Sequence, residues 1–156
     1  MEAINEILQG KLQNLVSYLS QITEGFESIS EDIENANLKT AMIALSVESK
    51  QYAEEINDQL QQFNVAIPLT NSGQLWQLIE TDTHEQASFS KGGEIIALCN
   101  NCEMYFNKLY ADVLQEYFPI TYFKDIITYQ LYATQCAFMK IRLLNTLRFS
   151  KQDQLN

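Results

Sequence analysis

The sequence has few residues that interrupt helices and few that carry positive charge. Only 5 glycines and 2 prolines occur in 156 residues, which favours long helices over a loop-rich or disordered chain. The 10 Lys and Arg are outnumbered by 20 Asp and Glu, and the net charge of −10 repels phosphate backbones and anionic membrane surfaces. No apolar run approaches the roughly 18 residues of a membrane-spanning helix. We therefore expect neither a nucleic acid nor a membrane as a partner.

Histidine is also scarce, and this limits metal and acid–base chemistry. The one histidine, His84, lies in a polar segment close to Asp82 and Glu85, where a solvated side chain is the simplest interpretation and an exposed metal contact is the alternative. The N-terminus lacks the basic region and long apolar stretch of a signal peptide. These features predict a cytoplasmic protein.

The cysteines are three in number, an odd count, and all fall within apolar helical patterns. We expect buried, reduced thiols rather than a disulfide framework. Cys99 and Cys102 form a C-x-x-C motif, but they lie inside a helical pattern with no second Cys/His pair nearby. The motif therefore predicts two core cysteines and not a redox or zinc site.

Four stretches of the chain repeat apolar residues at steps of three and four, the spacing of one face of a helix. The first of these stripes comprises Ile4, Leu8, Leu12, Leu15, Leu19, Ile22, Phe26, Ile29 and Ile33. Asn37 is placed to cap the second helix, and Ser90 to cap a third helix that runs on through Gly92 and Gly93. The fourth stretch, at residues 120–149, is hydrophobic almost all round. Such a helix is usually covered on both faces, here by the crossover described next or by a second subunit.

The connections between these stretches differ greatly in length. The first two stretches join through a short turn at residues 34–37, and the last two join at Phe118 and Pro119. The second and third are separated by a crossover at residues 64–90. Two helical hairpins joined by one long crossover are the ferritin-like form of the four-helix bundle, so we predict an all-α fold of this kind.

The crossover has a turn signal at residues 70–73 followed by apolar residues of its own, which predict a short extra helix. These residues are Leu75, Trp76, Leu78 and Ile79. We expect Trp76 to anchor the short helix on the bundle. Because no linker divides the chain, we predict a single domain at residues 1–150, followed by a polar C-terminal tail at residues 151–156 that we expect to be frayed.

Ferritin-like bundles often hold two metal ions, and the ligand pattern for such a centre is missing here. It requires one Glu from each of two helices and a Glu-x-x-His pair from each of the other two, and no such pair occurs in the sequence. The alternative is a partial site, because Glu24 or Glu27, Glu48 and Glu103 lie on three different predicted helices and two or three carboxylates can hold one hard cation. We otherwise expect no catalytic residue, no metal and no cofactor.

Glu103 has a structural interpretation beside the metal-binding one. It lies in the middle of an apolar face, where an unpaired charge would cost several kcal/mol, so it requires a partner or a raised pKa. The expected partners are Ser49, Thr134, Gln130 or a tyrosine hydroxyl, which together would form a polar layer across the core.

Short motifs on three of the predicted helices resemble one family. The third helix carries a Cys, a Glu four residues on, then a Tyr and a Leu, which are Cys99, Glu103, Tyr110 and Leu114. Gly25, Phe26 and Glu27 are similar to a Gly-aromatic-Glu motif of the first helix, and Ser49, Tyr52 and Ala53 to a Ser-x-x-aromatic-Ala motif of the second. Trp76 matches a crossover Trp. The family is an uncharacterised bacterial one with a ferritin-like four-helix bundle, known as domain of unknown function number 2383.

The resemblance implies a ferritin-like bundle with no assigned activity. The sequence departs from the family pattern at two places. Phe138 and Met139 occupy the position of a His-Asp pair on the fourth helix, and Met104 follows Glu103 where the family commonly has Asp. Both departures point away from metal chemistry.

These observations predict a small non-enzymatic protein that acts by protein association, as a homodimer through the fourth helix. The alternative is a degenerate ferritin-like metal-binding protein that uses Glu27, Glu48 and Glu103. A third hypothesis is a ligand pocket in the core, walled by aromatic side chains and floored by Glu103.

Overall fold

The computed structural model describes residues 3–65, 74–86 and 92–155, and within them it contains five helices and no strand. The helices are α1 (Glu6–Ser30), α2 (Ala36–Gln62), α3 (Gln74–Gln86), α4 (Gly93–Leu114) and α5 (Thr121–Leu155). The prediction of an all-α fold is therefore confirmed for the described part of the chain. The predicted turn at residues 70–73 and the predicted cap Ser90 lie outside it. The backbone of α5 is helical as far as Leu155, in the segment that we expected to be frayed, and the proposed domain limits stay a prediction.

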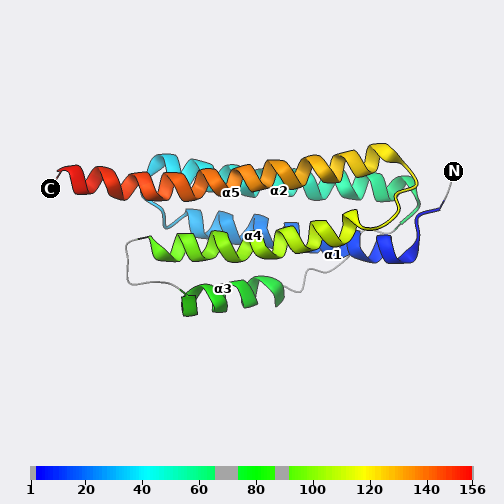
Figure 1. The fold of residues 1–156 in the computed structure, drawn as a ribbon, viewed down its shortest axis with the longest axis horizontal. Coiled ribbons are helices and arrows are strands. Elements are labelled where there is room, and N and C mark those ends of the chain that lie inside the picture. The colour runs from blue at the N-terminus through cyan, green and yellow to red at the C-terminus, as the bar shows by residue number, and fades with distance from the viewer. Residues whose placement is uncertain (1–2, 66–73, 87–91, 156) are drawn as a thin grey trace.

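The four long helices lie in two layers, with α2 and α5 in one layer and α1 and α4 in the other (Figure 1). α1 packs on α2, α2 on α5, α5 on α4 and α4 on α1, and each neighbour runs in the opposite direction. Of the described helices, the short helix α3 contacts only α1 and α4. It therefore covers the outside of the α1/α4 layer and leaves the α2/α5 layer open.

Asparagine side chains begin the first two helices. Asn5 Oδ1 accepts a hydrogen bond from the backbone N–H of Leu8 at 2.7 Å, and Asn35 Oδ1 accepts one from that of Leu38 at 3.0 Å. The expectation that Asn37 caps α2 was wrong, because Asn37 already lies within the first turn and Asn35 has the extended backbone of a cap. The first helix is also shorter than its apolar stripe, since it ends at Ser30.

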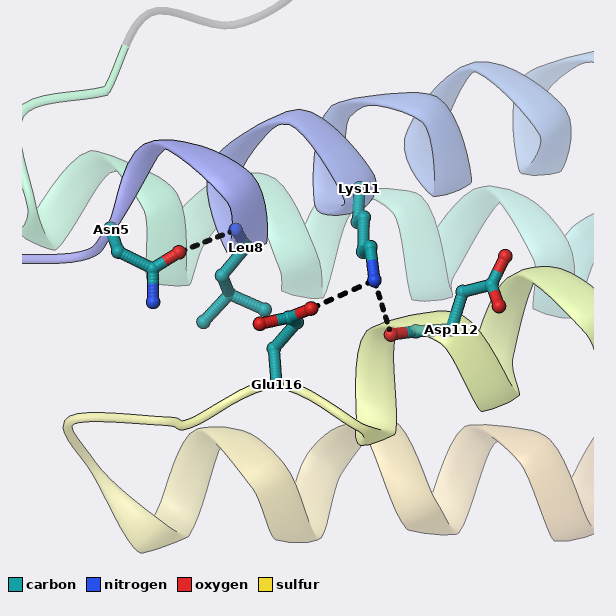
Figure 2. A network of polar contacts seen from close by, with 5 residues as sticks. All are labelled: Asn5, Leu8, Lys11, Asp112 and Glu116. Atoms are coloured by element: carbon teal, nitrogen blue, oxygen red, sulfur yellow. Dashed lines mark hydrogen bonds and ion pairs between the residues drawn. The ribbon is translucent and has the colours of Figure 1, made fainter.

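The start of α1 and the end of α4 are joined by one lysine (Figure 2). Lys11 Nζ lies 2.8 Å from Glu116 Oε1 and donates a hydrogen bond to the carbonyl of Asp112 at 3.2 Å. A cation near the last carbonyls of a helix is favourable because it compensates their partial negative charge. The ion pair is partly exposed, so its contribution to stability is at most about 1 kcal/mol.

Gly92, which we expected to lie inside a helix, instead precedes α4 as its cap. Its φ of 77° is in the left-handed region, and a Cβ there would lie 2.4 Å from the ring of Phe149. Asn145 Nδ2 donates to the carbonyl of Gly92 at 3.1 Å, which ties the start of α4 to α5. α4, the third of the four long helices, therefore begins at Gly93.

One hydrophobic cluster fills the space between the helices, and it includes the predicted apolar stripe of α1. The stripe residues that are at most 1% exposed are Leu8, Leu12, Leu15, Leu19, Ile22 and Phe26. Cys99 and Cys102 are completely buried, as predicted, whereas Cys136 is exposed, so the prediction of three buried thiols was wrong for this residue.

Trp76 anchors α3 on α1, as the sequence predicted. Its ring packs edge-on against Phe26 with centroids 6.0 Å apart, and its backbone N–H donates to Gln21 Oε1 at 2.8 Å. The ring lies directly over Gly25, where an added Cβ would come within 2.2 Å of it. Gly25 is therefore the position on α1 that allows the crossover helix to approach.

Candidate functional site

The three carboxylates of the hypothetical metal site lie at three different places in the bundle. Glu27 is exposed and lines a groove between α1 and α2. Glu48 is half-buried between α2 and α5, and burial raises its pKa more than the nearby charge of Lys140 lowers it. Glu103 lies between α4 and α5. Within the described residues, no group of three or more His, Cys, Asp or Glu side chains is placed to hold a metal ion.

Glu103 pairs with an arginine that the sequence analysis did not consider. Its Oε1 lies 3.3 Å from Arg142 Nη2, and the two side chains are 22% and 26% exposed. Arg142 Nη1 also lies 3.5 Å from Asn100 Oδ1. The carboxylate is thus half-buried, as expected, but its partner is a cation at the edge of the core. The signal that was missed is the position of Arg142 on the fourth stretch, opposite Glu103 in an antiparallel hairpin.

A polar layer does cross the core, and it is centred on Gln130 rather than on Glu103. Tyr110 donates its hydroxyl hydrogen to Gln130 Oε1 at 2.7 Å. Gln130 Nε2 donates to the carbonyl of Tyr52 at 3.2 Å and to Glu55 Oε2 at 3.0 Å. Burial raises the pKa of Tyr110 well above its usual value, so this hydroxyl stays protonated and donates as a neutral group. The layer links α2, α4 and α5.

Two further expected members of the layer are buried but make no contact of this kind. The hydroxyl oxygens of Ser49 and Thr134 are inaccessible to solvent and have no hydrogen-bond partner among the described residues. A buried hydroxyl without a hydrogen-bond partner costs free energy, so close packing at these two positions has to offset that cost. Since neither hydroxyl is hydrogen-bonded to a base among the described residues, neither is activated as a nucleophile.

The buried cysteines have no features of a reactive site. Burial is the main cause that raises the pKa of Cys99 to about 12, and it raises the pKa of Cys102 well above its usual value. Thiols with raised pKa values are protonated at neutral pH and are poor nucleophiles and metal ligands. Tyr18 donates its hydroxyl hydrogen to the carbonyl of Cys102, which further fixes this turn of α4 inside the core.

His84 is exposed on α3, at the edge of a pocket of about 650 Å³ between α1, α3 and the start of α4. Ile29, Ile95 and Leu98 form apolar walls, and Arg148 lies at the rim. The charged side chains that line this pocket are of both signs, and they include no group of three His, Cys, Asp or Glu among the described residues that could hold a metal ion. The arrangement does not favour one class of ligand.

The most distinctive surface of the molecule is the outward face of α5. Seven residues, which we call the α5 stripe, are exposed along it at helical spacing: Tyr122, Tyr129, Tyr132, Cys136, Met139, Leu143 and Leu147. The exposed fractions of the large side chains range from 46% for Leu147 to 66% for Tyr129. Scattered exposed apolar residues are ordinary, but a continuous row of them marks an interaction surface.

The apolar pattern of this helix predicted that either the crossover or a second subunit covers its outward face. The crossover helix α3 packs on α1 and α4, in the opposite layer, and makes no contact with α5 in the described part of the chain (Figure 1). Its own exposed face, with Leu78, points away from the bundle. No described residue therefore covers the α5 stripe.

The described helices include none that is long and apolar enough to cross a membrane. Comparisons of the chain with protein-family models, with curated proteins and with solved structures find no match to any of them.

Proposed function

We propose that this protein is a non-enzymatic, ferritin-like helical bundle of the cytoplasm that acts by protein association, and that it forms a homodimer through the α5 stripe. The observation that carries the proposal is the exposure of this row of apolar side chains on the helix that the crossover leaves uncovered. The simplest partner is a second copy of the chain, because the exposed faces of two α5 helices can bury each other around a twofold axis.

The size of the surface sets the expected affinity. From Tyr122 to Leu147 the stripe is about 40 Å long at 1.5 Å per residue. With a width of about 10 Å it offers on the order of 400 Å² per copy, about half of a standard interface. Interfaces of this size are weak and reversible, so we expect a dissociation constant in the micromolar range.

The ferritin-like part of the proposal is supported by the helix order and by the packing of the two hairpins against each other. Two residues of the family resemblance support the same fold: Trp76 lies in the crossover, and its ring packs over Gly25 of α1. At the position of the family's His-Asp pair, Phe138 is fully buried in the core and Met139 belongs to the α5 stripe. The metal-binding alternative has less support, because Glu27 and Glu48 line separate grooves and Glu103 is paired with Arg142.

A matched pair of methionines tests the association. Met139 on the α5 stripe is 62% exposed and Met104 on α4 is 55% exposed, so replacing either by lysine should leave the folded monomer intact. Light scattering at tens of micromolar, about the expected dissociation constant, should show an apparent mass well above that of the monomer for the unmodified protein and for Met104→Lys, and the mass of the monomer for Met139→Lys. Equal masses for the two variants would contradict the proposal.

A further inference from the structure

The charges beside the α5 stripe change sign along its length. Near its start, Glu55 and Asp58 of α2 and Asp125 of α5 line one pocket of about 480 Å³, which we call the acidic pocket. Farther along, Lys140 lines the next groove between the same two helices, and Arg142 lies on the other flank of α5. Because α2 and α5 run in opposite directions, the acidic second half of α2 lies beside the start of α5 (Figure 1). The stripe therefore has an acidic end and a basic end.

The acidic pocket contains the groups that bind an ammonium. Tyr122 and Tyr129 of the α5 stripe line it, and tyrosine rings attract cations. Gln59 also lines it, and its amide oxygen can accept a hydrogen bond. A lysine ammonium has three donors and no acceptor, so it can pair with the carboxylates and this amide oxygen together.

The basic end offers a lysine that is available for such a pocket. Lys140 is exposed on α5, and it makes no ion pair within 4.0 Å in the described part of the chain. Glu48 shares its groove, but the charge of Lys140 does not outweigh the burial of that carboxylate. Arg142 is less available because it is already paired with Glu103.

The spacing of residues along α5 places the acidic and basic ends symmetrically about a single point, through which the twofold axis of a dimer could pass. The midpoint between Asp125 and Lys140 falls just after Tyr132, and the midpoint between Tyr122 and Leu143 falls at the same place. An axis through this point, with the two helices antiparallel, sets the apolar residues of the stripe against each other and the basic end of each copy against the acidic end of the other. Each contact in such an interface is made twice. A parallel pair would instead bring like charges together.

We infer that two copies associate with their α5 helices antiparallel and that the acidic pocket of each copy receives the Lys140 ammonium of the other. This inference rests on the proposed association through the α5 stripe and adds its orientation, its register and its polar anchor. The arrangement also gives a reason why a chain of net charge −10 associates with itself, since the opposite charges meet locally while the remaining acidic surfaces face away.

Charge reversal tests the polar anchor. Lys140→Glu should raise the dimer dissociation constant about tenfold or more, because it removes two ion pairs and adds a carboxylate to each acidic pocket. Lys108→Glu, an exposed position on α4, makes the same change in net charge and should have little effect. Adding Asp125→Lys to Lys140→Glu should restore the association, because the charges are then exchanged between the two ends. Equal effects of Lys140→Glu and Lys108→Glu, or no recovery in the double variant, would overturn the inference.

Disulfide cross-linking tests the orientation separately. The same axis places Tyr129 opposite the partner's Cys136, whereas it separates the two copies of Cys136 along the helices. Under mild oxidation Tyr129→Cys should therefore give covalent dimers, and the unmodified protein, in which Cys136 is the exposed thiol, should give few. Covalent dimers of the unmodified protein at equal yield would indicate a parallel pair and contradict the inference.

The proposed function and this inference fail in different ways. If Met139→Lys abolishes association while Lys140→Glu acts no differently from Lys108→Glu, the association stands and the antiparallel anchor is wrong. If the unmodified protein remains a monomer at all concentrations, the proposed function is wrong and this inference with it.

Discussion

Replacement of Gly25 by alanine tests how the crossover helix is held on the bundle. The new Cβ would lie 2.2 to 2.4 Å from three atoms of the Trp76 ring, so either the ring or α1 must move. In a helix with free space, the same substitution adds about 1 kcal/mol of stability. Gly10, also within α1, has nothing within 4 Å of an added Cβ and is the matched control.

The expected cost follows from what Trp76 loses. Forcing extra volume into a packed contact costs about 1–3 kcal/mol. Displacement of the ring also weakens its edge-on contact with Phe26, which costs a further 0.5–1.5 kcal/mol or so. After subtraction of the helix-propensity gain of about 1 kcal/mol, we expect Gly25→Ala to lower the free energy of unfolding by about 0.5–3.5 kcal/mol and Gly10→Ala to raise it by up to about 1 kcal/mol.

The assay is urea unfolding followed by tryptophan fluorescence, because Trp76 is the one tryptophan of the chain. The emission of folded Gly25→Ala should shift to longer wavelength as the ring becomes more exposed, and that of Gly10→Ala should not. In a Trp76→Leu background, observed by circular dichroism, Gly25→Ala should no longer destabilise. Equal stability of Gly25→Ala and Gly10→Ala, with unchanged emission, would refute the packing of α3 on α1.

Three further predictions concern the core and its cysteines. Tyr110→Phe removes the donor to Gln130 Oε1 and leaves a buried oxygen unpaired, so urea unfolding should show a loss of about 1–3 kcal/mol, and an unchanged midpoint would contradict the polar layer. Since burial raises the pKa of Cys99 from 9.0 to about 12, the unfolded chain loses this proton first, and the free energy of unfolding should fall as pH rises between these values, with a smaller slope in Cys99→Ala. At a pH of about 8 a thiol reagent should modify only Cys136 in the folded protein, and rapid reaction of Cys99 or Cys102 would contradict their burial.

The sequence contains much of the information about the helices and their cores. Apolar residues at steps of three and four predicted the long helices, because one buried face is needed whatever the neighbour is. Trp76 and Gly25 were both visible as unusual residues, yet only Trp76 was assigned its role. The absence of a Cβ at Gly25 has meaning only once the Trp76 ring is known to lie over it.

Helix ends and the contacts between helices were harder to predict from the sequence. Two asparagines lie at the start of α2, and the choice of Asn35 over Asn37 as the cap depends on a backbone bend that spacing does not show. The pairing of Glu103 with Arg142 depends on how α4 and α5 are aligned, which shifts by one turn with small changes in the loop. The side of the bundle on which α3 lies determines the exposure of Cys136, and the apolar pattern of α3 fits either side.

Association through the α5 stripe can be measured by sedimentation equilibrium of the unmodified protein, which reports mass without variants, labels or a surface. We expect an apparent mass near 18.0 kDa at low concentration that rises towards twice this value between about 1 and 100 µM, the range of a weak reversible dimer. A mass that stays at 18.0 kDa throughout would contradict association through the α5 stripe.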